Sequence, residues 1–236
     1  MDFKSFNLNP RIAAGVEAAG FTEPTPIQAQ SIPKIMQHCD VMGLAQTGTG
    51  KTAAFGLPIL HQLMKGKLGH VRALIVAPTR ELAERINEAI TQPGKGSGLR
   101  SVTVYGGVGM NPQVTKLKRC LEIVVACPGR LLDHIKQGTI DLSKVDVLVL
   151  DEADRMFDMG YQDYIMSIIE MTPRQRQTLL FSATYPDEIK EVSHAIQIDP
   201  VDIRVESLHD NKQIEQIFYE IQKGERTKTL VALLQH

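Results

Sequence analysis

Short apolar runs separated by helical stretches are the feature that most constrains how this chain can fold. The clearest run, Val145–Leu150, reads Val-Asp-Val-Leu-Val-Leu and is nearly continuous rather than alternating. A strand that is apolar on both faces is typical of the centre of a parallel sheet covered by helices. Regular alternation of such runs with helices predicts an α/β domain, with a mostly parallel sheet and helices on both faces.

The expected elements follow this alternation over most of the chain. Seven strands are expected, at Asp40–Ala45, Ala73–Ala77, Ser101–Tyr105, Ile123–Ala126, Val145–Leu150, Thr178–Phe181 and Pro200–Val205. The helices expected between them include Thr52–Met64, Arg80–Thr91, Asn111–Arg119, Arg130–Lys136 and Asp187–His194. The glycine-rich segment Pro93–Gly98 is expected to form a turn.

A polar stretch after the seventh strand predicts a domain boundary. The expected division is a domain at 1–205, a linker at 206–213 and the start of a second domain at 214–236. In the last part we expect a strand at Ile214–Ile221 and a helix at Lys228–His236. Because one strand and one helix cannot form a core alone, we expect these residues to open a domain whose remainder is absent.

Composition narrows the function classes only slightly. The formal net charge is -1, from 26 Lys and Arg against 27 Asp and Glu, so overall charge gives no support to nucleic-acid binding. A local basic face remains compatible with that total. Three cysteines without a C-x-x-C pair favour reduced thiols over disulfides or zinc. We expect no signal peptide and no membrane span, hence a cytoplasmic protein.

A glycine-rich loop is expected between the first strand and the helix that follows it. Its residues are Ala45, Gln46, Thr47, Gly48, Thr49, Gly50, Lys51 and Thr52. Glycines let backbone N–H groups converge on phosphate oxygens, Lys51 would reach the β- and γ-phosphates, and the Thr52 hydroxyl would ligate Mg²⁺. The first position is Ala45 rather than glycine, and a turn that binds nothing is the alternative. The loop predicts a bound nucleoside triphosphate without naming the reaction.

Paired acids follow the apolar strand that ends at Leu150. The sequence there is Asp151-Glu-Ala-Asp154. Ligands in open α/β sheets bind at the carboxyl ends of strands, so Asp151 would hold Mg²⁺, directly or through water. Glu152 would orient or deprotonate the attacking water. The alternative is that these acids only cap the next helix.

Several motifs in order resemble those of the DEAD-box RNA helicases over about the first 205 positions. The matching segments are Phe3, Gly20–Gln28, Ala45–Thr52, Pro78–Ala83, Gly106-Gly107, Asp151–Asp154 and Ser182–Thr184. The resemblance is to the N-terminal, RecA-like P-loop lobe of that family. The residues from Gly43 to Gly50 are similar to those of bacterial members. It implies ATP and Mg²⁺ as cofactors and RNA as a partner.

The resemblance also assigns roles to residues. ATP would be bound by Phe21, Glu23, Gln28 and the loop Ala45–Thr52, with Lys51, Asp151 and Glu152 catalytic. RNA would be held by Pro78, Thr79, Arg80, Gly106, Gly107, Pro128, Gly129 and Arg130, and hydrolysis coupled to RNA by Asp154, Ser182 and Thr184. The amide of Gln28 could select adenine. Phe21 would stack on the base; the alternative is a core aromatic.

Two positions depart from the family's usual pattern. Cys127 stands where the family usually has Thr in Thr-Pro-Gly-Arg, and Arg85 stands where it often has Gln. A thiol is a poor hydrogen-bond donor, so a phosphate contact at Cys127 would be weaker. Arg85 would add a positive charge near the expected RNA path.

Two functions remain open from the sequence. The chain could be the ATP-binding lobe of an ATP-dependent RNA helicase that needs a second RecA-like lobe for activity. It could instead be a stand-alone ATP- and RNA-binding module that acts as a competitor or regulator. In the family the second lobe supplies arginines to the γ-phosphate, and we expect little activity without them.

Overall fold

The computed structural model describes residues 2–119, 121–205, 217, 219, 221 and 224–233. Contacts between Cα atoms divide the chain into two units, Met1–Glu206 and Ser207–His236. The first unit holds the whole sheet and both hydrophobic cores. Within the second unit, the helix α10 covers Arg226–Leu233 and its described side chains are not buried. The expected linker and most of the expected strand Ile214–Ile221 lie outside the described residues.

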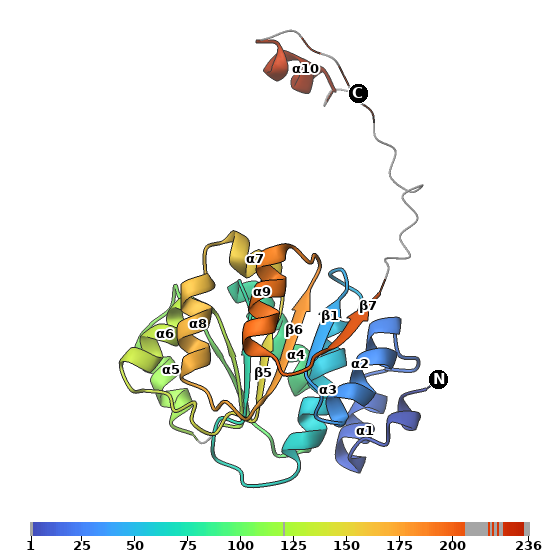
Figure 1. Ribbon diagram of the computed structural model, residues 1–236, viewed down its shortest axis with the longest axis vertical. Helices are drawn as coiled ribbons and strands as arrows, with labels where there is room; N and C mark the ends of the chain where they lie inside the picture. The colour runs from blue at the N-terminus through green and yellow to red at the C-terminus, as the bar shows by residue number, and fades with distance from the viewer. Residues whose placement is uncertain are drawn as a thin grey trace. The chain divides into compact units, whose positions relative to one another are not determined.

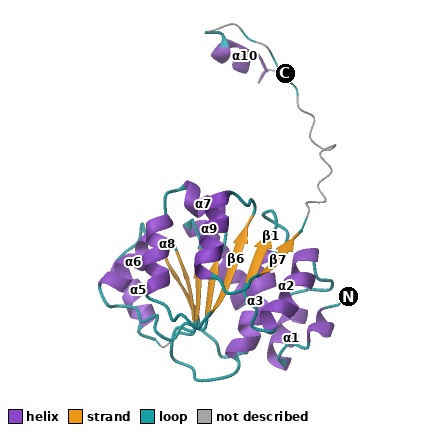
Figure 2. Ribbon diagram, in the orientation of Figure 1, coloured by secondary structure: helices purple, strands orange, loops and turns teal. Residues whose placement is uncertain are grey.

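The first unit is built on one seven-stranded sheet, and every strand pairing in it is parallel. The strand order is β3-β4-β2-β5-β6-β1-β7, with helices on both faces (Figure 2). The strands are β1 (Val41–Leu44), β2 (Ala73–Val76), β3 (Ser101–Val104), β4 (Ile123–Ala126), β5 (Val147–Leu150), β6 (Gln177–Ser182) and β7 (Val201–Arg204). All seven expected strands are therefore confirmed, with ends that shift by at most two residues.

Helices connect the strands and cover the sheet (Figure 1). They are η1 (Phe3–Phe6), α1 (Pro10–Ala18), α2 (Pro26–Met36), α3 (Lys51–Leu63), α4 (Arg80–Thr91), α5 (Met110–Leu117), α6 (Pro128–Lys136), α7 (Ala153–Asp158), α8 (Gln162–Glu170) and α9 (Asp187–Ile196). The five helices named from the sequence in this unit are present. None of the helices in the described ranges is long and apolar enough to cross a membrane.

Two hydrophobic cores lie on opposite faces of the sheet. One contains side chains of α1 to α4, and the other contains side chains of α6 to α9. Strand β2 serves both, because Ala73 and Ile75 belong to the first core and Leu74 and Val76 to the second. Successive side chains of a strand point to opposite faces, so a strand buried on both sides must be apolar throughout. This is the physical reason for the continuous apolar runs.

The structure adds helices that the sequence analysis did not name, of which α1 has clear start signals. Its N-cap Asn9 accepts a hydrogen bond from the Arg11 N–H at 3.0 Å, and Pro10 occupies the first turn. A capping side chain followed by proline is a common helix start. The segment Pro93–Gly98 forms the expected turn after α4.

The parallel arrangement brings all strand ends to one edge of the sheet. In spatial order, β3, β4 and β2 lie on one side of this edge, and β5, β6 and β1 lie on the other. The segments predicted to bind RNA follow the first three strands, whereas those predicted to bind nucleotide phosphates follow β1 and β5. The fold therefore separates the two sets of residues along one edge.

Candidate functional site

The glycine-rich loop connects β1 to α3. Gly48 and Gly50 adopt φ angles of 87° and 93°, in the left-handed region that favours glycine. A Cβ atom at Gly50 would also collide with the Gln28 side-chain amide. The first turn of α3 has no side-chain cap, so its N–H groups remain available at the positive end of the helix. This geometry suits an anion such as a phosphate.

Lys51 is folded into this loop. Its Nζ donates to the Ala45 carbonyl oxygen at 2.8 Å, and the residue is only 6% exposed. On the opposite wall of the loop, the Thr49 hydroxyl donates to the Gln46 carbonyl at 2.7 Å. A buried ammonium with a single backbone partner keeps two further N–H donors for an anion in the loop.

Gln28 joins the N-terminal segment to the phosphate loop. It lies in the first turn of α2, where its Oε1 accepts the Thr25 N–H at 3.0 Å. Its Nε2 donates to the Gly50 carbonyl at 3.1 Å, and the residue is 3% exposed. One N–H of the amide remains beyond these two contacts. A ligand that binds Gln28 would therefore act directly on Gly50 through this hydrogen bond.

The two other residues expected around the adenine lie near the surface. Phe21 is half-buried, packs against the first core and contacts the Phe3 ring edge-to-face, with centroids 5.5 Å apart. Phe3 thereby anchors the Phe21 ring. Glu23 is exposed. The contact with Phe3 accounts for part of the Phe21 surface, and the other part stays accessible.

Asp151 and Glu152 follow β5 directly. Asp151 is 2% exposed, and this burial raises the pKa of its carboxyl to about 6, although Lys51 acts in the opposite direction. Its Oδ1 accepts the Glu152 N–H at 3.0 Å. A buried carboxylate beside Lys51 at the carboxyl end of a strand is a suitable ligand for a hard divalent cation.

Glu152 has a strained backbone and a restrained carboxylate. It adopts φ 51° and ψ 51°, an uncommon left-handed conformation for a residue with a side chain. Its Oε1 lies 3.3 Å from the Thr47 hydroxyl, and its Oε2 lies 3.3 Å from Nη1 of Arg155. Thr47 thus links Glu152 to the phosphate loop. The sequence analysis did not identify Arg155, although it directly follows the tetrapeptide.

Asp154 connects β5 to the segment after β6. Its Oδ2 accepts the Thr184 N–H at 2.9 Å and the Thr184 hydroxyl at 2.8 Å. Its own N–H donates to the Ser182 hydroxyl at 3.3 Å. The Ser182 carbonyl in turn accepts the Ala45 N–H at 3.0 Å, which ties β6 to the phosphate loop. The three residues expected to couple hydrolysis to RNA are therefore in direct contact.

The segment after β2 begins α4. Thr79 is the N-cap, and its hydroxyl accepts the Leu82 N–H at 3.2 Å. Arg80 is exposed, with its guanidinium carbon 4.8 Å from the centre of the Tyr105 ring. The Tyr105 hydroxyl donates to the carboxylate of Glu84. Tyr105, which the sequence analysis did not single out, therefore supports Arg80 from the neighbouring segment after β3.

The segments after β3 and β4 also meet. Gly106 and Gly107 are exposed, and Gly107 has a φ angle of 79°. Nη1 of Arg130 donates to the Val108 carbonyl at 3.0 Å, and its Nε pairs with Asp133 at 3.6 Å. Pro128 and Gly129 form the first turn of α6. The exposed glycine pair and Arg130, which is fixed by Val108 and Asp133, thus lie together at the ends of β3 and β4.

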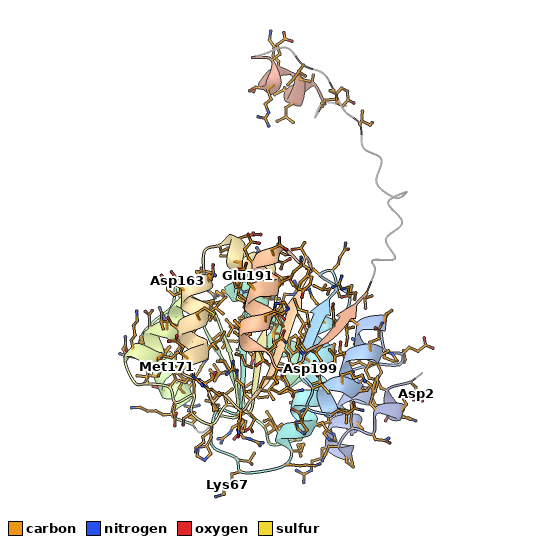
Figure 3. All side chains as sticks on the ribbon, in the orientation of Figure 1. Asp2, Lys67, Asp163, Met171, Glu191 and Asp199 are labelled. Carbon is orange, nitrogen blue, oxygen red and sulfur yellow. The ribbon has the colours of Figure 1, made fainter. Side chains whose placement is uncertain are left out.

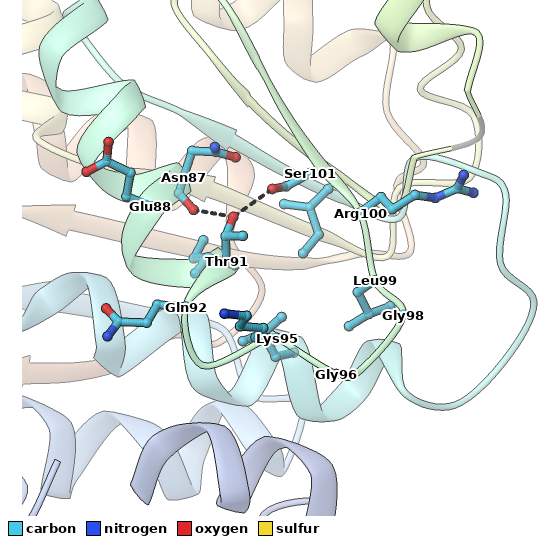
Figure 4. A pocket seen from close by; sticks show the side chains of 14 residues that line it. Asn87, Glu88, Thr91, Gln92, Lys95, Gly96, Gly98, Leu99, Arg100 and Ser101 are labelled. Carbon is cyan, nitrogen blue, oxygen red and sulfur yellow. Dashed lines mark hydrogen bonds between the residues drawn. The ribbon is translucent and has the colours of Figure 1, made fainter. Parts of the chain in front are cut away.

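A cleft of about 460 Å³ lies between the two halves of this edge. Its lining residues are Thr47, Thr79, Glu81, Leu82, Arg85, Glu152, Asp154, Arg155 and Ala183. A larger cleft, of about 850 Å³, lies beside the end of α4 and the start of β3, away from these residues (Figure 4). We regard the smaller cleft as the site because it brings together the predicted nucleotide and RNA segments.

Comparison with known proteins gives the family. The family model described as DEAD/DEAH box helicase matches residues 25–192, which is more than half of the chain. The chain belongs to the DEAD/DEAH box helicase family. This confirms the resemblance identified from the motifs, and the matched range includes the phosphate loop, the acidic tetrapeptide and Ser182–Thr184.

This DEAD-box chain is similar to bacterial proteins described as RNA helicases. It is 44% identical over 233 residues to the ATP-dependent RNA helicase CshA of Listeria monocytogenes, covering 98% of this chain and 45% of that protein. It is 41% identical to the DEAD-box ATP-dependent RNA helicase CshA of Bacillus subtilis, covering 47% of that protein. The chain spans about half the length of these curated relatives.

The solved structure of a DEAD box protein from the hyperthermophile Methanococcus jannaschii has the same fold. The TM-score is 0.82 at 34% sequence identity, over all of this chain and 64% of that one. The RecA-like α/β fold expected from the sequence is therefore confirmed.

Magnesium fits the donor set of this DEAD-box site. No group of three or more His, Cys, Asp or Glu side chains that could hold a metal occurs among the described residues. Mg²⁺ in nucleotide sites uses one or two protein oxygens together with substrate phosphates and water. Asp151 and the Thr52 hydroxyl are the protein oxygens that would serve, and the ion would neutralise charge on the phosphates.

The two departures from the family pattern have different settings. Cys127 is the N-cap of α6 but makes no side-chain cap hydrogen bond, and burial raises the pKa of its thiol to about 11. The Cys127 side chain is thus a neutral, weakly polar group at this helix start. Arg85 is exposed and lines the 460 Å³ cleft. Its positive charge therefore lies in the space between Thr79 and Glu152.

Proposed function

We propose that this chain is the ATP- and RNA-binding lobe of a bacterial ATP-dependent DEAD-box RNA helicase. The observation that carries the proposal is the arrangement along the sheet edge. Lys51, Asp151 and Glu152 are buried side by side after β1 and β5, and Asp154 and Thr184 connect them to the segment after β6. The relatives' descriptions as RNA helicases support the same function. A cytoplasmic location remains a prediction from the sequence.

The phosphate loop would bind the β- and γ-phosphates of ATP. The backbone N–H groups at the start of α3 would donate to their oxygens, and Lys51 would exchange the Ala45 carbonyl for a phosphate oxygen. This exchange has a small cost, because one hydrogen bond replaces another in a site that is already formed. Gln28 would add adenine selection and transmit it to the loop through Gly50.

Glu152 would position the attacking water. Thr47 and Arg155 hold its two carboxylate oxygens, so the side chain is directed before substrate arrives. Proton transfer to a positioned carboxylate contributes about 10²–10⁴-fold to the rate of many enzymes. Charge on the transferring phosphoryl group needs further stabilisation, and in the family the second lobe supplies arginines for it. Such arginines are worth about 10³–10⁵ in rate.

RNA would lie along the ends of β3, β4 and β2. Arg80, the exposed glycine pair and the first turn of α6 would contact sugar and phosphate, which carry no base sequence information. RNA binding should therefore be largely independent of sequence. The hydrogen bonds between Asp154 and Thr184 would couple the nucleotide half of the edge to movement of the segment after β6.

The test compares this chain with a longer protein that carries a second RecA-like lobe. We expect the 236-residue chain to bind ATP with Mg²⁺ but to hydrolyse it slowly, with little stimulation by RNA and no unwinding. The two-lobed protein should show RNA-stimulated turnover faster by orders of magnitude. Unwinding of a short duplex by the 236-residue chain alone would contradict the requirement for two lobes.

A pair of variants separates catalysis from binding in the two-lobed protein. Glu152→Gln should keep ATP binding and abolish hydrolysis, because the amide preserves size but cannot accept the proton. Glu81→Gln is a matched control, since Glu81 lines the same cleft but lies on α4. Undiminished turnover in Glu152→Gln would assign the water-activating role to another group.

A further inference from the structure

Positive charge gathers at the edge of the sheet where the strands begin, opposite the proposed site. Segments 65–72, 141–146 and 172–176 lead into β2, β5 and β6, which are neighbours in the sheet. Together they contain six Lys or Arg and two Asp, although the formal net charge of the chain is -1. We call the six cations the basic rim: Lys65, Lys67, Arg72, Lys144, Arg174 and Arg176.

The loop that carries half of the basic rim has a defined shape. Nη1 of Arg72 donates to the carbonyls of Leu63 at 3.2 Å and Lys65 at 2.7 Å. The fully buried carboxylate of Glu122 accepts the Gly69 N–H at 2.8 Å. The loop is thus attached on both sides. A ligand would find the backbone of the loop already ordered, so less chain entropy is lost on binding.

A cleft of about 510 Å³ lies between this loop and the other two segments. Lys67, His70, Arg72 and Lys144 line it, and Asp146 is the one acidic residue among the lining residues. Asp146 is paired with Arg72 at 2.7 Å, so it offsets a charge that the loop already uses. Lys67 and Lys144 are exposed and make no hydrogen bond or ion pair within the described ranges. Figure 3 shows Lys67 at the end of the domain opposite α7.

The larger cleft beside β3 adds two cations to this surface and one acid, Glu88. Lys95 and Arg100 line it, and both side chains are exposed (Figure 4). Glu122 links the loop 65–72 to Arg100, because its carboxylate also accepts the Arg100 N–H at 2.9 Å and pairs with the Arg100 guanidinium at 4.0 Å. Cations therefore extend along the strand starts from β6 to β3.

We propose that the basic rim is a second RNA-binding surface, which holds the phosphates of a strand that continues beyond the helicase site. This inference rests on the proposed function for the identity of the polyanion. Val145 and Pro173 are the apolar side chains lining the 510 Å³ cleft, whose lining includes His70 but no Phe, Tyr or Trp. Protein partners generally need large apolar or aromatic anchors. Spaced cations with few apolar or aromatic neighbours match a sugar-phosphate backbone, bound without regard to sequence.

The test measures binding of labelled RNAs to the 236-residue chain by fluorescence anisotropy. A short RNA of about 8 nucleotides lies within the usual size of one single-strand site, about 4–16 nucleotides, and an RNA of about 30 nucleotides can reach both edges. The rim variant is Lys67→Gln with Lys144→Gln. The control is Lys4→Gln with Lys34→Gln, which makes the same charge change at exposed positions on η1 and α2.

We expect the rim variant to bind the short RNA like the unaltered chain and to lose affinity for the long RNA. Each lost phosphate contact should lower the slope of log affinity against log salt concentration by about 0.7. For the two lysines removed, the ratio of the affinities of the unaltered chain and the rim variant should fall about sevenfold between 50 and 200 mM salt. The control should bind both RNAs normally. Equal losses in rim variant and control, an unchanged long-RNA affinity, or an equal loss for the short RNA would each overturn the proposal.

Two further measurements separate this inference from the proposed function. Arg80→Ala should weaken binding of the short RNA about tenfold, as expected for one hydrogen bond between charged groups, while the rim still contributes to binding of the long RNA. The long RNA could bind in a way that depends on the basic rim while the short RNA does not bind at all. That result would support the basic rim as an RNA-binding surface and contradict the proposed RNA site after β3, β4 and β2. Rim-dependent binding of a polyglutamate peptide, with unchanged long-RNA affinity, would instead assign the surface to an acidic protein.

Discussion

The ends of β5, β6 and β1 and the ends of β3, β4 and β2 share one edge of the sheet but differ in exposure. On the proposed nucleotide side, Lys51, Asp151 and Glu152 are 6%, 2% and 9% exposed, and each has a hydrogen-bond partner in the loop or the tetrapeptide. On the RNA side, Arg80 and Gly106 are open to solvent. Charges that act on a transferring phosphoryl group gain from a dry, preorganised site. Charges that hold a mobile polyanion must be reachable from water.

The largest effect should come from removing the cation of the nucleotide side. Lys51→Ala should abolish the stabilisation by ATP and Mg²⁺, which is about 2.7 kcal/mol at a hundredfold excess over Kd. RNA binding should remain. Thermal unfolding with and without nucleotide measures this, and Lys34→Ala, an exposed lysine of α2, is the control. A normal ATP shift in Lys51→Ala would remove the phosphate loop from the site.

The next effect concerns the two aspartates of the tetrapeptide, which should respond oppositely. Burial raises the pKa of Asp151 to about 6, so its charge destabilises the nucleotide-free fold at neutral pH. Asp151→Asn should therefore raise the free energy of unfolding by about 1–3 kcal/mol, at 1.36 kcal/mol per pKa unit. It should also abolish the Mg²⁺ dependence of ATP binding.

Asp154→Asn is the counterpart. Burial acts to raise the pKa of Asp154, but hydrogen bonds from Thr184 and Arg155 outweigh it and lower the pKa. Its carboxylate is therefore stabilising, and the amide should lower the free energy of unfolding. Denaturant unfolding of both variants without nucleotide compares them. A change in the free energy of unfolding with the same sign in both variants would contradict this prediction.

On the exposed side, Arg80→Ala should weaken RNA binding about tenfold, as expected for one hydrogen bond between charged groups. Unrelated RNA sequences should be affected equally, and the nucleotide shift should not change. Tyr105→Leu should have a smaller effect in the same direction, because it removes the ring under Arg80 while the charge remains. A loss confined to one RNA sequence would indicate base recognition instead.

The smallest effect is a pH dependence of the RNA side. His134 of α6 is fully buried, and this burial, together with nearby Arg130, lowers its pKa. The fold favours neutral His134, so stability is full above pH 6.5 and decreases as pH falls from 6.5 through the lowered pKa. One group contributes at most about 1.4 kcal/mol per pH unit. Asp151 and His61 also titrate in this range, in the unaltered chain and in His134→Gln alike. The difference in unfolding free energy between the two proteins should therefore show the His134 slope between pH 7.5 and 5.5.

The sequence anticipated the elements well because their signals are local. Short β-rich runs marked all seven strands: several, such as Val147–Leu150, are continuously apolar, whereas the edge strands β3 and β7 alternate. The glycines at 48 and 50 marked a loop whose φ angles only glycine tolerates easily. The motifs also gave the family, which the comparisons confirm. The roles of the individual site residues remain predictions, although the structure brings the nucleotide set together.

Other parts of the site could not be read from the sequence. The Tyr105 ring contacts Arg80, which lies 25 residues earlier in the chain. Arg155 contacts Glu152 because α7 begins directly after β5. A lone tyrosine or arginine at these positions carries no signal of its own. The same holds for the basic rim, since its three segments are separated by about 70 and 30 residues.

By itself the sequence determined which segments become strands, because an apolar run buried on both faces can be satisfied in few other ways. It also determined the chemistry of each strand end. Only the tertiary structure decided which strand ends are neighbours, and hence that the residues proposed to bind nucleotide and those proposed to bind RNA occupy two halves of one edge. Strand order depends on pairing between residues distant along the chain, and each local pattern is compatible with many such orders.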